Sequence, residues 1–317
     1  MTLYLTEHDV EQIVTMPDAL RVVEEAFRAL GEQSATNRPR QRVRVPDGVL
    51  QVMPGGLPAR GYVGFKYYAS FRGKTRFWFH LLDAHSGDLL AVMQADRLGQ
   101  QRTGAASGVA SKYLARPDAA TLGLLGTGWQ AESQLQAVCA VLPIRIARCY
   151  SREAERRTAF AQKLGAQLGI ELRAVDSAEE AAREADIVVT ATNTREPVLR
   201  GEWLAPGAHV NAIGSNRAEA REIDDETVSR SALIVVDSIE QSKIESGDLI
   251  GPVERGRLSW DQIHELGAVV AGKIAGRRNR DDITLFKSNG IAVEDVALGG
   301  WVYERAREIG AGKEIVI

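Results

Sequence analysis

Residues 121–131 read TLGLLGTGWQA, and they are the most informative segment for predicting the fold. Its apolar first half predicts a buried strand, and GTGWQA at 126–131 fits the pattern G-x-G-x-x-A directly before a helical pattern. Gly126 permits a tight turn, Gly128 lets the backbone approach a pyrophosphate, and Ala131 lets the helix pack closely on the strand. The free N–H groups at the start of that helix favour an anion. Because strand, turn and helix follow one another, the sequence predicts a dinucleotide-binding loop rather than a simple turn.

Beyond this loop the chain alternates between strand and helix patterns. The strands are predicted at 121–126, 145–151, 171–175, 186–192, 209–214 and 233–237, and the helices at 130–141, 153–164 and 178–185. Nearly continuous apolar strands that alternate with helices are typical of a parallel sheet covered on both faces. The fold class predicted here is therefore α/β, with a Rossmann-type doubly wound parallel sheet.

The residues before 118 follow a different rhythm. A helix is expected from Met16, because Pro17 and Asp18 suit a first helical turn. Strand patterns occupy 41–45, 49–53, 62–69, 77–83 and 89–94, separated by turn signals such as PDG at 46–48. They predict an antiparallel sheet with flanking helices, which is a smaller α+β domain. A small-residue helix is expected at 102–114, and a long helix at 292–309 would make the first domain discontinuous if it returned to it.

Composition and charge exclude several classes of function. The chain has 317 residues, of which 44% are apolar, and its 39 basic and 42 acidic residues give a net charge of −3. This balance argues against a nucleic-acid partner or a membrane surface, and no run approaches the roughly 20 apolar residues that span a bilayer. The N-terminus lacks a secretory pattern, and two cysteines, Cys139 and Cys149, favour a reducing cytoplasm. The five histidines do not cluster with cysteines or acids, so no metal site is expected.

The end of the second predicted strand bears on the choice of cofactor. An NAD site usually places an acid about 20 residues beyond the glycines, where it binds the ribose 2′-hydroxyl. Ser151 and Arg152 occupy this place, and a hydroxyl with a guanidinium suits a 2′-phosphate. The sequence therefore favours NADP(H) over NAD(H). The alternative is that Arg152 is solvated and that Glu153 binds the ribose.

Several cationic side chains of the first domain are candidates for holding an acidic substrate. Arg40, Arg42 and Arg44 alternate along one strand face, for which a solvated sheet edge is the usual explanation. Lys66 lies among aromatic residues, where burial would lower its pKa and make it a useful acid or base, unless its stem simply reaches solvent. Arg102 opens the small-residue helix, where it would clamp a carboxylate with two hydrogen bonds. Taken singly, each is equally compatible with a structural role.

Six stretches stand in a characteristic order along the chain. They are RTGAASGVASKYLARPD at 102–118, LLGTGWQAESQLQA at 124–137, ADIVVTATNTREPVL at 185–199, NAIGSN at 211–216, REID at 221–224 and LFKSNGIAVEDVA at 285–297. Together they resemble the ornithine cyclodeaminase/mu-crystallin family over nearly the whole chain. The resemblance implies a homodimer, a nicotinamide cofactor and a small anionic amino or imino acid as substrate. It also implies a substrate-binding and dimerisation domain at 1–115 with 293–317, and a Rossmann domain at 116–292.

Matched residue by residue, the resemblance also implies roles. Arg102 corresponds to the family arginine that binds the substrate carboxylate, and Lys66 to the family lysine near the carboxylate and the reacting carbon. A third cation is expected ahead of Met53 and the proline after it; Arg40 fits best by spacing, and Arg42 stays open as an alternative. Met53 joins these residues as a substrate-binding candidate. The cofactor-binding candidates are Thr103, Gly126, Thr127, Gly128, Trp129, Gln130, Ser151, Arg152, Thr190, Ala191, Thr192, Ser288, Asn289 and Gly290.

One departure from the family pattern concerns the chemistry. Family members that cyclodeaminate ornithine carry an aspartate just after the glycine that ends one strand, and here the segment reads AIGSNR at 212–217, so the matching residue is Asn216. Asparagine cannot act as a general base and carries no charge to pair with an ammonium group. It can still hydrogen-bond an imine or amine nitrogen. Lys66 and Asn216 are therefore the catalytic candidates for net hydride transfer.

Three functions follow from these observations. The first is an NAD(P)H-dependent reductase of imines alpha to a carboxylate, such as 1-pyrroline-2-carboxylate, or the reverse amino-acid dehydrogenase. The second is an ornithine cyclodeaminase, an ammonia lyase that forms proline, and Asn216 argues against it. The third is a non-catalytic, ligand-binding protein like mu-crystallin, and the intact cationic set argues against it. His209, Asp237 and Asp295 are expected to be structural, as a strand residue, a strand-end acid and a helix-start acid.

Overall fold

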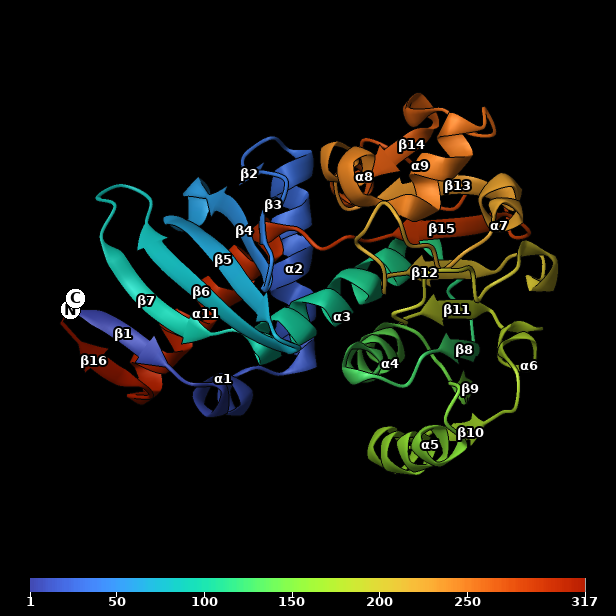
Figure 1. Cartoon of the computed structure of the whole chain (residues 1–317), viewed down its shortest axis with the longest axis horizontal. Helices are drawn as coiled ribbons and strands as arrows, with labels where there is room; N and C mark the ends of the chain where they lie inside the picture. Colours follow the sequence, from blue (N-terminus) through green and yellow to red (C-terminus); the bar gives the residue numbers. More distant parts are fainter. Residues whose placement is uncertain (317) are drawn as a thin grey trace. The chain divides into compact units, whose positions relative to one another are not determined.

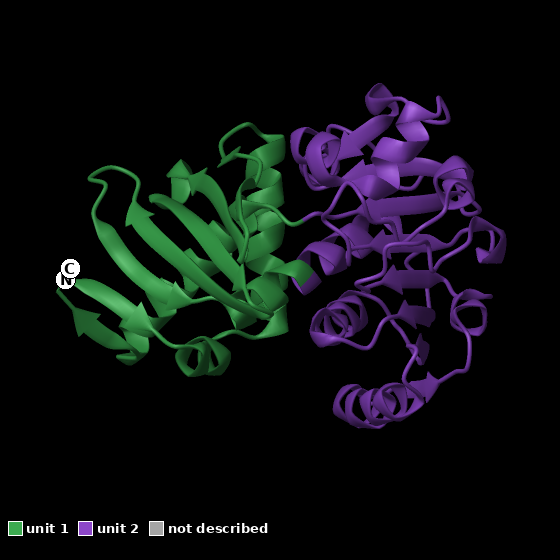
Figure 2. Cartoon of the chain, viewed as in Figure 1, with its two compact units in different colours: residues 1–103, 290–317 green, residues 104–289 purple. Residues whose placement is uncertain are grey.

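The computed structural model describes residues 1–316 and divides the chain into two compact units (Figure 2). Unit 1 comprises Met1–Thr103 and Gly290–Ile317, and unit 2 comprises Gly104–Asn289. The chain leaves unit 1 within helix α3 (Asp96–Leu114) and returns to it between Asn289 and Gly290. Compact units need not coincide with folding domains, so the domain division expected from the resemblance stays a prediction.

Unit 2 contains a parallel sheet of eight strands within the described residues. In the order in which they pair, the strands are β10 (Glu171–Ala174), β9 (Ile146–Tyr150), β8 (Thr121–Leu125), β11 (Ile187–Thr190), β12 (His209–Ala212), β15 (Ile283–Lys287), β13 (Ser231–Val236) and β14 (Ile263–Glu265). Each predicted strand of this half is present with slightly different bounds. Two strands were not predicted from the sequence, β15 and the short β14. Strand β15 is fully buried and lies between β12 and β13.

Helices cover both faces of this sheet (Figure 1). They are α4 (Trp129–Val141), α5 (Ala154–Leu168), α6 (Ala178–Ala182), α7 (Asp225–Arg230), α8 (Ile239–Glu245), α9 (Gly247–Glu254) and α10 (Leu266–Val270). Alternate side chains of a strand point to opposite faces, so Val188 joins one apolar core while Ile187 and Val189 join the other. Both cores are buried, and the sheet is doubly wound as the sequence predicts.

Unit 1 contains a mostly antiparallel sheet. Its strands are β1 (Thr2–Leu5), β2 (Thr36–Asn37), β3 (Gln41–Val45), β4 (Gly48–Leu57), β5 (Tyr62–Phe71), β6 (Lys74–Asp83), β7 (Leu89–Gln94) and β16 (Lys313–Ile315). The predicted antiparallel pairing is confirmed from β3 to β7, whereas β1 pairs with β7 in parallel. The main path of the sheet runs β16-β1-β7-β6-β5-β4-β2, with β3 paired to β4 beside it.

Helices α1 (Glu7–Ile13), α2 (Met16–Gly31) and α11 (Ala292–Ile309) pack on one face of this sheet (Figure 1). The side chain of Thr15 caps α2 by accepting a hydrogen bond from the Asp18 N–H, with Pro17 in the first turn. Phe79, Leu81 and Met93 are fully buried beneath the helices. The residues that alternate with these along the same strands therefore point to the other face of the sheet.

Candidate active site

The phosphate loop has the backbone that a pyrophosphate needs. Gly126 has φ +106°, and a Cβ there would lie 2.3 Å from the carbonyl oxygen of Ala191, so only glycine fits. Gly128 caps α4 without a side-chain hydrogen bond, which leaves the first N–H groups of this helix without a side-chain acceptor. A Cβ on Gly128 would meet no atom within 4 Å, so the loop is open where an anion would approach. These residues fit a dinucleotide phosphate.

The ribose end of this candidate site lies at the end of β9. The Thr127 hydroxyl donates a hydrogen bond to Ser151 Oγ at 2.8 Å, which ties the phosphate loop to the β9 end. Arg152 and Glu153 are both exposed, so either one is available to a ribose or to its 2′-phosphate. Arg157 is buried instead and donates to the Ser151 carbonyl at 3.0 Å. Trp129, which is also a cofactor candidate, is 47% exposed.

The remaining cofactor candidates of unit 2 follow the ends of its central strands. Thr190 ends β11, and Ala191 and Thr192 follow it directly. Ser288 and Asn289 follow β15 and are buried. Asp237 holds them: its carboxylate accepts from the Ser288 hydroxyl at 2.9 Å and from the Asn289 N–H at 2.7 Å. Asp237 is thus the predicted strand-end acid, and it also orders candidate cofactor residues.

In unit 1 three cations predicted from the sequence meet in one buried cluster. Lys66 is 2% exposed, and its Nζ lies 2.8 Å from both carboxylate oxygens of Asp295. Arg102 donates from Nε to Asp295 at 3.1 Å and from Nη1 to Glu294 at 2.8 Å. Arg40 is also buried and donates to the carbonyl oxygen of Gly290 at 3.3 Å. We call these five side chains, Arg40, Lys66, Arg102, Glu294 and Asp295, the cation cluster.

The charges of the cation cluster suit a monocarboxylate. Three cations and two carboxylates leave a single net positive charge, which one substrate carboxylate would neutralise. The pKa of Lys66 is lowered to about 8, mainly by burial and also by the Arg102 and Arg40 charges, while Asp295 opposes the shift. Lys66 can therefore exchange a proton near neutral pH.

The structure distinguishes Arg40 from Arg42 as the candidate for the third cation. Arg40 contacts Met53 through Nε to Sδ at 3.4 Å, and Met53 pairs with Lys66 across β4 and β5. Arg42 lies on β3 and donates to Gln51 at 3.1 Å, and Arg44 is exposed. The alternation on β3 is therefore a partly solvated edge, and only the residue just before that strand lies in the cation cluster.

Thr103 and Gly290 are the predicted cofactor-binding residues that belong to unit 1. The Thr103 hydroxyl donates to the carbonyl of Gly99 at 2.7 Å, one helical turn earlier. Gly290 has φ +75°, and a Cβ there would lie 2.5 Å from Nη1 of Arg102, so glycine is needed for the guanidinium to fit. Gly290 therefore shapes the cation cluster and is also the last residue of the SNG segment.

Sequence reasoning missed the two acids of the cluster. Glu294 and Asp295 lie in the first turn of α11, where acids usually serve the helix dipole, and this is how Asp295 was interpreted. Asp295 is such a helix-start acid, but the structure adds that both carboxylates are fully buried and bind Arg102 or Lys66. The available signal was their place in the EDVA stretch beside SNG, in a helix start with no solvent-facing pattern.

Other titratable groups are excluded from acid–base chemistry. His209 is fully buried between Thr284 and Asn211, and burial lowers its pKa to about 3, which confirms a strand residue. Burial raises the pKa of Cys139 to about 12 and that of Cys149 to about 11, so neither thiol is activated. Within residues 1–316 no group of three His, Cys, Asp or Glu residues is placed to hold a metal ion.

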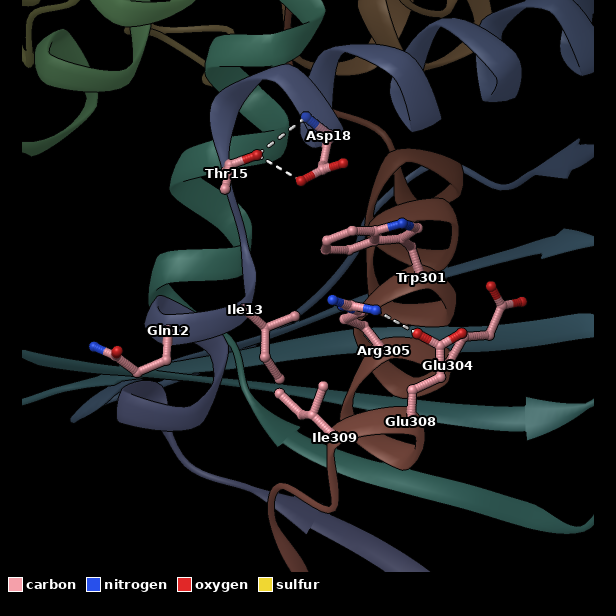
Figure 3. Close-up of a pocket in the computed structure, with 9 residues that line it drawn as sticks. All are labelled: Gln12, Ile13, Thr15, Asp18, Trp301, Glu304, Arg305, Glu308 and Ile309. Atoms are coloured by element: carbon pink, nitrogen blue, oxygen red, sulfur yellow. Dashed lines mark hydrogen bonds and ion pairs between the residues drawn. The ribbon is translucent and has the colours of Figure 1, made fainter.

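A hollow of about 510 Å³ lies elsewhere in unit 1 (Figure 3). It is lined by the end of α1, the start of α2 and the second half of α11. Trp301 and Ile13 form its apolar part. Its charged groups are paired within the protein, since Arg305 binds Glu308 at 2.6 Å and Glu304 accepts from Tyr62 at 2.9 Å. This hollow has no excess of cations, so it is a weaker candidate for a carboxylate site than the cation cluster. None of the helices in residues 1–316 is long and apolar enough to cross a bilayer.

The chain is similar in sequence and in structure to several known proteins. Delta(1)-pyrroline-2-carboxylate reductase of Bacillus cereus is 42% identical over 236 residues, covering 74% of this chain and 72% of the relative. The structure of Thermococcus litoralis Delta(1)-pyrroline-2-carboxylate reductase in complex with NADH and L-proline has a TM-score of 0.95 at 38% identity and covers 99% of this chain and 100% of that one. An archaeal alanine dehydrogenase dimer with bound NAD has a TM-score of 0.94 at 35% identity, with 99% of each chain covered.

The sequence model of the ornithine cyclodeaminase/mu-crystallin family matches residues 1–310. Its match covers both the phosphate loop of unit 2 and the cation cluster of unit 1, and the sequence motifs that resemble the family lie within it. The chain belongs to the ornithine cyclodeaminase/mu-crystallin family.

Proposed function

We propose that the protein is an NAD(P)H-dependent oxidoreductase that reduces the C=N bond of a small imino acid, with 1-pyrroline-2-carboxylate as the type of substrate, and oxidises the matching amino acid in reverse. The observation that carries this proposal is the buried cation cluster with one net positive charge, in a chain that also has a dinucleotide-binding loop. The relatives named for pyrroline-2-carboxylate reduction and alanine dehydrogenation perform the same class of C–N chemistry, which supports it.

Each residue of the site has a proposed task. Arg102 and Arg40 bind the substrate carboxylate through charge-assisted hydrogen bonds. Lys66 supplies the proton that the product needs, directly or through a water molecule, and accepts one in the reverse direction. Asn216, which is half-buried after β12, orients the substrate nitrogen without a charge of its own. When bound, the nicotinamide supplies or accepts the hydride.

The proposal is tested by mixing the protein with NADPH or NADH and 1-pyrroline-2-carboxylate and following the absorbance of the reduced nicotinamide. We expect turnover, and slower amino-acid oxidation in reverse. Full cofactor binding with no turnover on any cyclic imino acid or small amino acid would contradict it. Ammonia release from ornithine without added reductant would instead support the cyclodeaminase, and Asn216→Asp is the variant expected to gain that activity.

The proton-transfer role of Lys66 predicts opposite pH profiles in the two directions. Since its pKa is lowered to about 8, Lys66 is protonated below that pH and neutral above it. We expect kcat/KM for imine reduction to fall as pH rises through about 8, and kcat/KM for amine oxidation to rise through the same region. Steady-state rates from pH 6 to 10 measure both, with Lys66→Arg as a control that should lack the inflection. Parallel profiles in both directions would exclude this role.

We infer a preference for NADP(H) over NAD(H) from the end of β9. No acid follows this strand directly, and the exposed Arg152 is available for a 2′-phosphate. A charge-assisted hydrogen bond contributes about 1.5–3 kcal/mol, so Arg152→Ala should raise the KM for NADPH by about tenfold or more and leave NADH unaffected. Glu153→Gln is the matched control. If Glu153→Gln weakens NADH binding while Arg152→Ala changes nothing, the preference is for NAD(H).

We also infer a homodimer formed through the sheet face of unit 1 that faces away from α2 and α11. Aromatic rings gather on that face: Phe65 stacks on His80 at 4.8 Å between centroids, and Tyr4 lies 6.3 Å from Trp78. A connected, partly exposed aromatic face is typical of a protein interface. Light scattering of Trp78→Glu should then give a monomer where the wild-type protein gives a dimer; a dimer that persists would place the interface elsewhere.

A further inference from the structure

Glu222 has a carboxylate that joins the ends of two neighbouring strands of unit 2. The residue is fully buried, in the segment between β12 and α7. Its Oε1 accepts from the N–H of Thr192 at 2.7 Å and from the Thr192 hydroxyl at 2.7 Å. Its Oε2 accepts from the N–H of Gly214 at 2.5 Å and from the Thr190 hydroxyl at 3.0 Å. One side chain thus fixes the backbone after β11 and the backbone after β12.

A second buried charge fixes the next residue of the same loop. Lys287, at the end of β15, is fully buried and donates to the carbonyl oxygen of Ser215 at 2.6 Å. Asp248 compensates its charge at 3.0 Å and also accepts the N–H of Glu222 at 2.7 Å. The loop at 214–216 is therefore clamped on both sides, by Glu222 at Gly214 and by Lys287 at Ser215.

This clamp leaves little freedom to the residue that follows it. A Cβ on Gly214 would lie 2.3 Å from the Thr192 carbonyl oxygen and 2.5 Å from Glu222 Oε1, so the loop packs tightly on both. Asn216 comes directly after the clamped residues, and in the proposed function it orients the substrate nitrogen. A small shift of the clamp would displace Asn216, and a misplacement of about 1 Å is enough to lower a rate about a hundredfold.

We propose that Glu222 is a positioning residue of the reaction, which fixes Asn216 by linking the 190–192 segment to the 214–216 loop. The assignment deepens the proposed function and rests on it. The chemistry explains why a carboxylate is needed: each of its two oxygens accepts a fixed backbone N–H, so an amide, which has only one oxygen, must lose one of the two bonds.

The variant that tests this is Glu222→Gln, with Asp186→Asn as its matched control. Asp186 is also a carboxylate that joins two strands, since it accepts the N–H groups of Ala120 and Thr121 at 2.9 and 3.0 Å, but it does so at the opposite, amino-terminal end of β8 and β11. Glu222→Gln should lower kcat for the imino acid about tenfold to hundredfold when measured at saturating NADPH, where weaker cofactor binding at the candidate residues Thr190 and Thr192 does not affect the rate. Asp186→Asn should lower Tm while kcat stays near the wild-type value.

A second measurement does not depend on the substrate. Hydrogen exchange of the unliganded protein should be at least about tenfold faster at the Thr192 and Gly214 amides in Glu222→Gln than in the wild-type protein. If Glu222→Gln fails to fold, Thr190→Val removes one hydrogen bond of the same carboxylate and should show the same effects, reduced in size. Wild-type kcat with accelerated exchange, or an equal loss of kcat in Asp186→Asn, would overturn the proposal. An inactive wild-type protein would contradict the proposed function alone, since the exchange result would still report on the clamp.

Discussion

Lys66→Met is expected to lower kcat for imino-acid reduction by about a hundredfold to ten-thousandfold, which is the range that a positioned general acid contributes. The Lys66 ammonium contacts Asp295, and the charges of Arg102 and Arg40 are close enough to lower its pKa. Methionine has a similar length and no proton to give, so the proton would have to come from bulk water. Cofactor affinity should not change, because Lys66 is not among the candidate cofactor-binding residues.

The same substitution should change stability little. Burial disfavours the charged form of Lys66, and Asp295 keeps Arg102 as a partner at 3.1 Å when the lysine is removed. Removing one partner of a buried ion pair is costly when it leaves a charge uncompensated, but without Lys66 the two arginines still balance the two carboxylates of the cation cluster. We therefore expect an inactive variant whose Tm lies within a few degrees of the wild-type value, measured by calorimetry.

Two outcomes would contradict this assignment. A Lys66→Met variant that keeps more than about a tenth of the wild-type kcat would exclude proton transfer by this side chain. A variant that loses its kcat together with its cofactor affinity and its Tm would indicate a structural role. Lys66→Arg restores the charge without a titratable proton near neutral pH, so it should recover substrate binding more than turnover.

The fold was predictable where its signals are local. The phosphate loop is decided by two glycines and an alanine within residues 121–131, and Gly126 has the positive φ that this reasoning requires. Strand β15 escaped prediction because it ends in Lys287, a charge that is unusual in a buried strand. The partner of Lys287 in its ion pair, Asp248, lies on α9, far away in the sequence, so no local sequence pattern indicates this pair.

The cation cluster was predictable in part, for a related reason. Residue chemistry and resemblance together singled out Lys66, Arg102 and, by its spacing, Arg40, but two arginines on one strand face left Arg42 open as an alternative. Of the two acids that compensate them, Asp295 was interpreted only as a helix-start residue, because an acid in a first helical turn needs no partner to be explained. Only the return of α11 to unit 1 brings those acids to the arginine and the lysine.

Arg102→Lys is expected to raise the KM for the imino acid by about a hundredfold or more, with a smaller effect on kcat. The guanidinium serves Asp295 through Nε and Glu294 through Nη1, and its planar fork can still meet a carboxylate with two hydrogen bonds. A lysine keeps the net positive charge of the cluster but has no fork, and two charge-assisted hydrogen bonds of about 1.5–3 kcal/mol each account for the loss.

Arg102→Met removes the charge as well and separates binding from folding. The cluster would then have no net charge, and buried Glu294 and Asp295 would lose their guanidinium partner, which should lower the free energy of unfolding by about 3–5 kcal/mol. Arg102→Lys should lower it less, so its KM effect is not a consequence of unfolding. Denaturant titrations of both variants measure this difference.

The decisive comparison uses a substrate that has no carboxylate. 1-Pyrroline carries the same C=N bond as 1-pyrroline-2-carboxylate but cannot bind the guanidinium, so the wild-type protein should reduce it poorly and Arg102→Lys should reduce it equally poorly. The two enzymes would then differ for the imino acid and agree for the neutral imine, which assigns the effect to the carboxylate. An equal loss on both substrates would show that Arg102 acts on the cluster's structure instead, because the fork has no carboxylate to hold in 1-pyrroline.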